Sequence, residues 1–221
     1  MKTINKLIQI AMMFTLIAPF SACKKDKPLV HIDIMQHYIA GKFTYQQGTP
    51  LPFALIPIST TKATFVWVGA KREVNYTFEN NRFTTNINGE EFSCDIINGA
   101  TQNIVVNSTA LGIPVAVLNK KEDAELALAG KRFEAPLNRL DNGAVVFDIY
   151  YFRFIADATK FNYTSNPLPG NYLIITKNYE NLADGCFYDQ EEIAFGVMLN
   201  NKLEIEAKIG DNYTLFSGTK K

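Results

Sequence analysis

Residues able to carry out acid–base or nucleophilic chemistry are few in this sequence. Only two histidines occur, His31 and His37, and as metal ligands they would need Asp33 and a distant third partner. Without another histidine, a Ser-His-Asp or Cys-His arrangement is hard to build. An enzyme is therefore the least favoured class of function.

One acid-rich segment, 184–192, offers the carboxylates of Asp184, Asp189, Glu191 and Glu192. Ca²⁺ prefers such oxygens, but their spacing matches no calcium loop. Glycosidase-type acid pairs meet only in space, and nothing in the sequence nominates one. We therefore expect solvated acids here, and we predict no metal or cofactor.

Aromatic residues are better candidates, for binding rather than catalysis. In the segment 144–156, one strand face carries Phe147, Ile149 and Tyr151, and the other carries Tyr150, Phe152 and Phe154. Both faces are apolar, so we expect the strand to be covered on both sides. One cover is the core. The other, beside Tyr150, Phe152 and Phe154, is a ligand cavity, a second sheet or the other half of the chain.

A second aromatic candidate is the loop 161–172, which mixes aromatic rings with amide and hydroxyl groups. Tyr163 and Tyr172 lie beside asparagines there, and such pairs suit sugars or peptides, because a ring stacks while an amide forms hydrogen bonds. β-Proteins also place Tyr and Asn in loops without such a role. Both readings stay open.

The first 22 residues have the pattern of a secretory signal peptide. Lys2 and Lys6 precede the apolar stretch 7–20, and the small residues Ser21 and Ala22 follow it. The apolar stretch has about 14 residues, whereas a membrane-spanning helix needs roughly 20. We therefore predict export, with cleavage before Cys23.

The segment Phe20-Ser21-Ala22-Cys23 resembles the bacterial lipobox, although Leu is usual where Phe20 stands. The resemblance implies that Cys23 receives diacylglycerol and carries several acyl chains, which is what stable anchoring requires. Residues 23–33 would then form a solvated tether. The Cys-Lys-Lys-Asp start is similar to lipoproteins of the Bacteroidota, which implies a place on the outer membrane, with its face left open.

The composition after that cleavage excludes a nucleic-acid partner. Loss of Lys2 and Lys6 reduces the 22 basic residues to 20, against 22 acidic ones. This balance offers no basic stripe for a phosphate backbone. Two cysteines remain, Cys94 and Cys186. They could form a disulfide in an exported protein, and buried free thiols explain them equally well.

The rest of the chain is predicted to be all-β, mainly antiparallel meanders with one or two short helices. Strands are expected at 64–68, 73–78, 82–87, 91–97, 193–199, 202–209 and 213–217. The turns between them are Asn80-Asn81, Asn88-Gly89, Asn200-Asn201 and Gly210-Asp211. Helix-like segments are 34–39 and 120–129.

Each helix-like segment is followed by Gly-Lys and then an aromatic residue, Phe43 in one case and Phe133 in the other. This order resembles the lipocalin-like domains of small Bacteroidota lipoproteins, which usually have Trp at that place. The resemblance implies two small barrels or sandwiches, at 34–119 and 120–221. A weak repeat and the turns common to all β-meanders explain the similar segments equally well. One continuous β-sandwich is the alternative.

Two functions remain in balance. A ligand-binding envelope lipoprotein, for lipid, glycan or peptide, predicts a barrel with a void. An accessory subunit of an envelope complex predicts a filled core with an exposed apolar face or strand edge for a protein partner.

Overall fold

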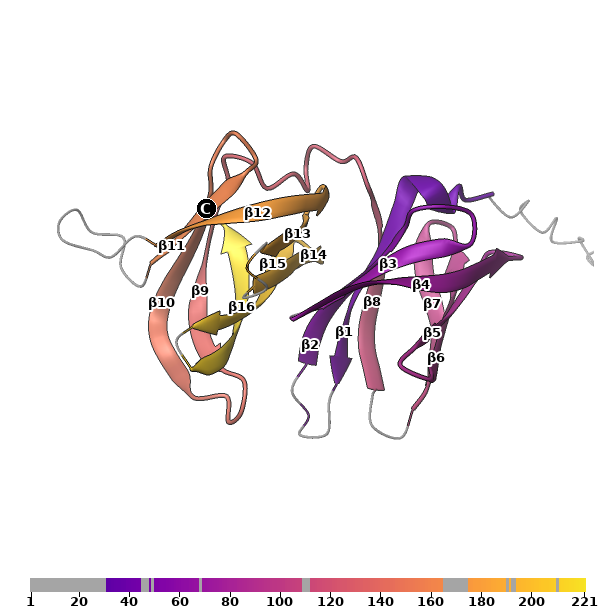
Figure 1. Cartoon of the computed structure of the whole chain (residues 1–221), viewed down its shortest axis with the longest axis horizontal. Coiled ribbons are helices and arrows are strands. Elements are labelled where there is room, and N and C mark those ends of the chain that lie inside the picture. Colours follow the sequence, from indigo (N-terminus) through magenta and orange to yellow (C-terminus); the bar gives the residue numbers. More distant parts are fainter. Residues whose placement is uncertain are drawn as a thin grey trace, which may run out of the picture.

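The computed structural model describes residues 31–221 except 45–47, 49, 68, 109–111, 165–174, 190, 192–193 and 210. In this part of the chain, nearly every element is an antiparallel strand, and the strands form two successive eight-stranded units (Figure 1). The predicted all-β fold is confirmed, as two barrel-like units rather than one continuous sandwich.

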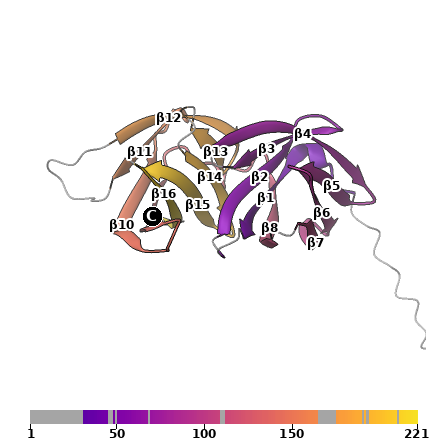
Figure 2. The same ribbon diagram turned by 60° about the horizontal axis from the view of Figure 1, so that its bottom comes forward.

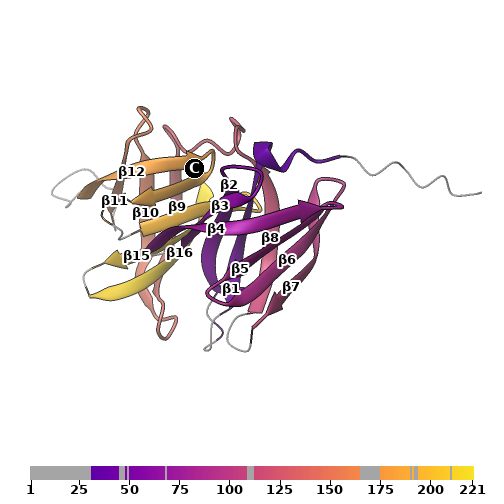
Figure 3. The same ribbon diagram turned by 45° about the vertical axis from the view of Figure 1, so that its right-hand side comes forward.

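The first unit, called here the first barrel, is an up-and-down sheet that curls on itself. Its strands are β1 (His37–Thr44), β2 (Pro50–Pro57), β3 (Lys62–Trp67), β4 (Ala70–Glu79), β5 (Arg82–Ile87), β6 (Glu90–Ile97), β7 (Ala100–Asn107) and β8 (Gly112–Lys120). The first strand pairs with the last, from His37↔Lys120 to Thr44↔Gly112. β7 lies beside β8 (Figure 3), where the Thr101 hydroxyl donates a hydrogen bond to the carbonyl of Ala116.

The second unit, the second barrel, is fully closed. Its strands are β9 (Arg132–Arg139), β10 (Val145–Phe154), β11 (Lys160–Thr164), β12 (Ile175–Ala183), β13 (Cys186–Asp189), β14 (Ala194–Leu199), β15 (Lys202–Ile209) and β16 (Asn212–Lys220). Closure comes from β16 and β9, which pair from Thr214↔Arg139 to Lys220↔Phe133.

The asparagine-containing turns of the hairpins lie at the positions predicted from the sequence. Asn80, Asn81, Asn88, Asn200 and Asn201 all have positive φ, between 49° and 65°, as the tight turns of twisted hairpins require. The hairpins that they join are thereby confirmed. The two units share one strand order, yet the Asn-Asn turns are not equivalent. In the first barrel the turn follows the fourth strand, and in the second it follows the sixth.

Both helix predictions are largely wrong. Only Ile34–Gln36 is helical, as one 3₁₀ turn capped by the Asp33 carboxylate, and Tyr38 and Ile39 are in β1 because both faces of that strand are buried. Lys120 ends β8, and 121–131 is a chain of turns. This connection buries Leu128 in the core of the second barrel.

Each unit has its own core, dominated by phenylalanine. Three glycines make room for these rings. A Cβ on Gly41 would lie 2.5 Å from the Phe53 ring, and on Gly196 it would lie 2.2 Å from that of Phe187. On Gly218 it would lie 2.2 Å from the Phe216 ring. Small residues beside large ones are how a narrow barrel is filled.

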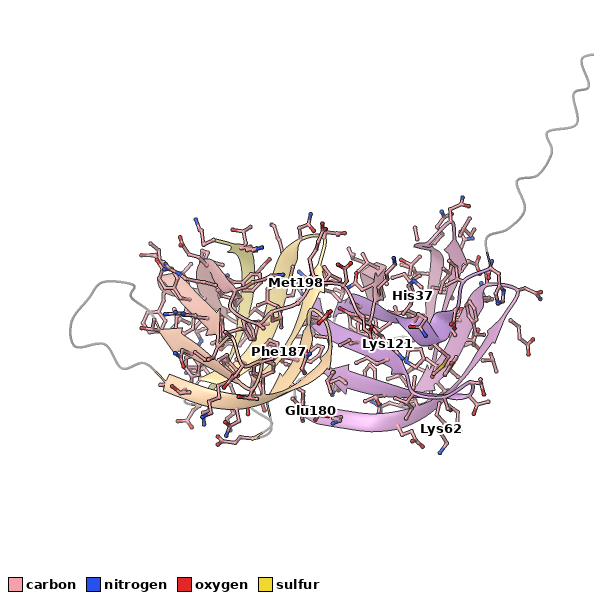
Figure 4. The ribbon with its side chains drawn as sticks, turned by 90° about the horizontal axis from the view of Figure 1, so that it is seen from above. His37, Lys62, Lys121, Glu180, Phe187 and Met198 are labelled. Carbon is pink, nitrogen blue, oxygen red and sulfur yellow. The ribbon has the colours of Figure 1, made fainter. Side chains whose placement is uncertain are left out.

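A third apolar cluster joins the two units. It contains Tyr38, Ala40, Ala54, Ile56 and Val66 of the first barrel and Ala183, Cys186, Tyr188, Phe195, Val197 and Leu199 of the second. β14 lies against β1 and β2 (Figure 2). The pairs Lys42–Glu204, at 2.8 Å, and Lys71–Glu180, at 2.5 Å, cross the same junction, where Figure 4 labels Glu180.

Of the two alternatives left open for Cys94 and Cys186, the structure has the buried free thiols, and the two residues belong to different apolar clusters. Cys94 is in the core of the first barrel and Cys186 is in the junction, both buried and free. Burial raises the pKa of the Cys94 thiol to about 12 and also raises that of Cys186. Both therefore stay protonated and unreactive.

Within the described residues, no helix is both long and apolar enough to cross a membrane.

Candidate functional site

The inward-facing aromatic residues of β10 form the core of the second barrel. Tyr150, Phe152 and Phe154 point inward, and Tyr163 of β11 joins them. Successive rings are in contact, with centroids 6.1 Å apart for Tyr150 and Tyr163 and 5.1 Å apart for Phe154 and Phe187. Burial also raises the pKa of Tyr150. These residues are therefore a neutral, tightly packed ladder of rings.

One small opening lies beside this ladder among the described residues. The opening beside it measures about 10 Å³, and it is lined by Phe152, Phe161, Tyr163, Asp189, Ala194, Ala207, Lys208 and Ile209. That volume holds roughly one water molecule. Tyr150, Phe152 and Phe154 thus support the barrel wall from within, and a ligand at this opening would require the rings around it to move.

Asp189 is the one carboxylate at this opening, and its burial was not expected. Its Oδ1 accepts a hydrogen bond of 2.7 Å from the Glu191 amide, while its side chain is fully buried. Burial raises the pKa of the Asp189 carboxyl. Asp184 is also structural, because its Oδ2 accepts a 2.7 Å bond from the Asp123 amide. Among the described residues, no three His, Cys, Asp or Glu side chains gather as metal ligands.

The outward side of β10 was predicted to be covered, and most of its first half is exposed. Val145, Val146, Phe147 and Ile149 are exposed, with Val145 at 55% and Ile149 at 46%. Tyr151 is covered by the Arg132 guanidinium 4.1 Å above its ring, and Phe147 is covered in part because it stacks on Tyr150, with ring centroids 5.6 Å apart. Irregular pairing with β9 between Val145 and Tyr150 breaks the alternation of faces on which the prediction relied.

The same segment is also a strand edge. Over 145–150, the only described partner of β10 is β9, whereas pairing with β11 begins at Tyr151. We call 145–150 the β10 edge. It combines four exposed apolar side chains and the charged Asp148 with backbone groups that have a strand on one side only within the described residues. An exposed edge of this kind can pair with a strand of another chain.

Three sequence-based candidates lie outside the described residues or away from this surface. Cys23 and Tyr172 lie outside the described residues. His37 begins β1, and its Nδ1 lies 2.8 Å from the carbonyl oxygen of Asp33, as part of the local turn.

Comparison with known proteins finds no similar protein. No family model, no curated protein and no solved structure matches this chain.

Proposed function

We propose that this protein is a lipid-anchored accessory protein of the cell envelope that holds a partner protein against the β10 edge. The observation that carries the proposal is the group of exposed apolar side chains Val145, Val146, Phe147 and Ile149, interrupted by Asp148, on a stretch of β10 whose partner among the described residues is β9 alone. Large apolar groups gathered on a surface are typical of protein–protein contacts. A partner strand added to this edge would gain both main-chain hydrogen bonds and apolar burial.

The packing of the second barrel favours this role over that of a carrier. A small-molecule site normally encloses about 300–1,000 Å³, whereas the opening beside the aromatic ladder, among the described residues, is about 10 Å³. A ligand bound at this opening would therefore need a rearranged core. The β10 edge can be reached without any such change.

The lipid anchor rests on the lipobox-like segment that ends at Cys23. We expect Cys23→Ala to move the protein from the membrane fraction into the soluble fraction, because no acyl chain can then be attached. Immunoblotting of the separated fractions measures this. A variant that stays with the membranes would remove the anchor from the proposal.

The partner is tested by a matched pair of substitutions. Ile149→Lys puts a charge on the β10 edge, and Val105→Lys puts the same charge at a similarly exposed site, 41% against 46%, on β7 of the first barrel. Each variant is purified from native membranes in mild detergent together with its stoichiometric partner. We expect the amount of partner recovered to fall at least tenfold with Ile149→Lys and to stay unchanged with Val105→Lys. Mass spectrometry measures the partner.

The accessory role is contradicted if the protein purifies alone, or if both lysine variants keep the partner equally. Recovery of a bound small molecule in place of a protein would favour the carrier.

A further inference from the structure

An open groove of about 510 Å³ lies over the outer face of β4, β5 and β6 in the first barrel. It is lined by Thr77, Glu79, Asn80, Asn81, Arg82, Thr84, Asp95 and Ile97. The volume falls within the usual range for small-molecule sites. None of these residues belongs to the β10 edge, so the groove needs its own explanation.

The floor of the groove is a braced polar network. Arg82 donates from Nη1 to Asp95 Oδ1 and from Nη2 to Ser93 Oγ, both at 2.7 Å. Asn103 donates from Nδ2 to Asp95 Oδ2 at 2.8 Å. The bonds from Asn103 and Arg82 lower the pKa of Asp95, so the carboxylate keeps its charge. Polar groups held this way are positioned before any ligand arrives.

A β-bulge makes this network possible. Pairing between β6 and β7 shifts register between Ser93 and Asp95, and Asn103 on the opposite strand has a φ of 46°. That left-handed conformation is unusual within a strand. It allows the Asn103 amide to reach Asp95. Bulges are common beside binding sites, where they redirect one side chain.

The wall of the groove is the tight turn between β4 and β5. Asn80 and Asn81 both have positive φ, and the Asn81 carbonyl accepts a 2.7 Å hydrogen bond from the Ile96 amide of β6. This bond fixes the turn over the floor. The wall contributes the Asn80 amide to the lining, and the neighbouring strands add the hydroxyls of Thr77 and Thr84.

We propose that the groove binds a neutral, polyhydroxylated ligand, with the dimensions of a mono- or disaccharide. The charges lining it are Glu79, Arg82 and Asp95, and the Arg82 charge is already paired with Asp95. An anionic ligand would therefore find no unpaired positive charge in this lining. Ile97 is the only aliphatic side chain in the lining, and seven of the eight lining residues carry polar side-chain groups. Amides and hydroxyls both donate and accept, as sugar hydroxyls do.

The test is an NMR titration of the ¹⁵N-labelled soluble domain, residues 24–221, with glucose, galactose, mannose, N-acetylglucosamine and cellobiose. The cut falls next to the proposed anchor cysteine and keeps both barrels whole. We expect at least one sugar to shift the amide signals of 77–84 and 95–97 in a saturable way, with a Kd on the order of 1 mM.

Two variants locate the site. Arg82→Met removes the floor network, and Asn80→Gly removes a wall amide at a positive φ that glycine adopts without strain. Each should weaken binding at least fivefold, whereas Arg139→Met, which breaks an exposed Arg–Asp pair on the second barrel, should leave it unchanged. The groove assignment is overturned if no sugar shifts these signals, or if both groove variants bind normally. The neutral-ligand assignment is overturned if sulfate or Ca²⁺ shifts them and no sugar does.

Discussion

Replacing Phe187 with alanine is expected to lower the free energy of unfolding by about 3–5 kcal/mol, the usual cost of removing a buried phenylalanine. Its ring is fully buried in the second barrel, with ring centroids 5.1 Å from Phe154 and 5.4 Å from Phe161. It also lies over Gly196 (Figure 4 labels Phe187). Neighbouring strands hold all these groups, so the space left by the ring cannot collapse fully.

Urea unfolding followed by circular dichroism measures this loss. Tyr213→Ala is the control, because Tyr213 is an exposed aromatic residue of the same barrel and its loss should change stability by less than about 0.5 kcal/mol. Trp67 is the only tryptophan and lies in the first barrel. Its fluorescence therefore tells whether the first barrel unfolds in the same transition. A loss below about 1 kcal/mol for Phe187→Ala would contradict the rigid packing described above.

Glu206→Gln is expected to stabilise the protein at pH 8 by roughly 2–4 kcal/mol and to change little at pH 4. Glu206 is 2% exposed on the face of β15 that turns toward the first barrel, opposite Phe195. Burial raises the pKa of its carboxyl to about 8, from an ordinary 4.5. The folded protein therefore keeps a proton that the unfolded chain releases.

The sign follows from proton binding. Between pH 4.5 and about 8 the folded state holds more protons than the unfolded state, so stability falls as pH rises through this window. A glutamine cannot ionise, and it removes this slope. Urea unfolding of both proteins at pH 4, 6 and 8 measures the difference. Glu73→Gln, at an exposed pair with Lys62, should show no such trend. A Glu206→Gln difference that does not change with pH would show that the carboxylate is ionised in the folded state.

Local patterns in the sequence predicted the hairpins well, because a turn that contains asparagine or glycine is determined by about four consecutive residues. Strands 82–87 and 202–209 were predicted at their observed limits. The prediction of a helix at 120–129 was wrong because the structure there depends on tertiary packing and not on local sequence. These residues favour helix locally, but the connection between the barrels must bury Leu128, and tertiary packing overrides so weak a preference.

The candidate surface was predicted only in part. The alternation of β10 correctly placed Tyr150, Phe152 and Phe154 on one face, since that depends on strand geometry alone. Exposure of Phe147 and Ile149 was not predicted, because it depends on irregular pairing with β9 and on where β11 ends. Nor does any local signal show that Asn103 reaches Asp95, because the bulge that brings them together arises from the pairing of two strands.

The up-and-down order of both barrels also sets the order in which they can fold. Most strands pair with the next strand along the chain, so hairpins can form one after another. Only β1 with β8 and β9 with β16 must bring distant residues together. Loop-closure entropy makes such contacts slow. We therefore expect barrel closure to limit the folding rate, and the junction between the barrels, which needs strands from both, to form last.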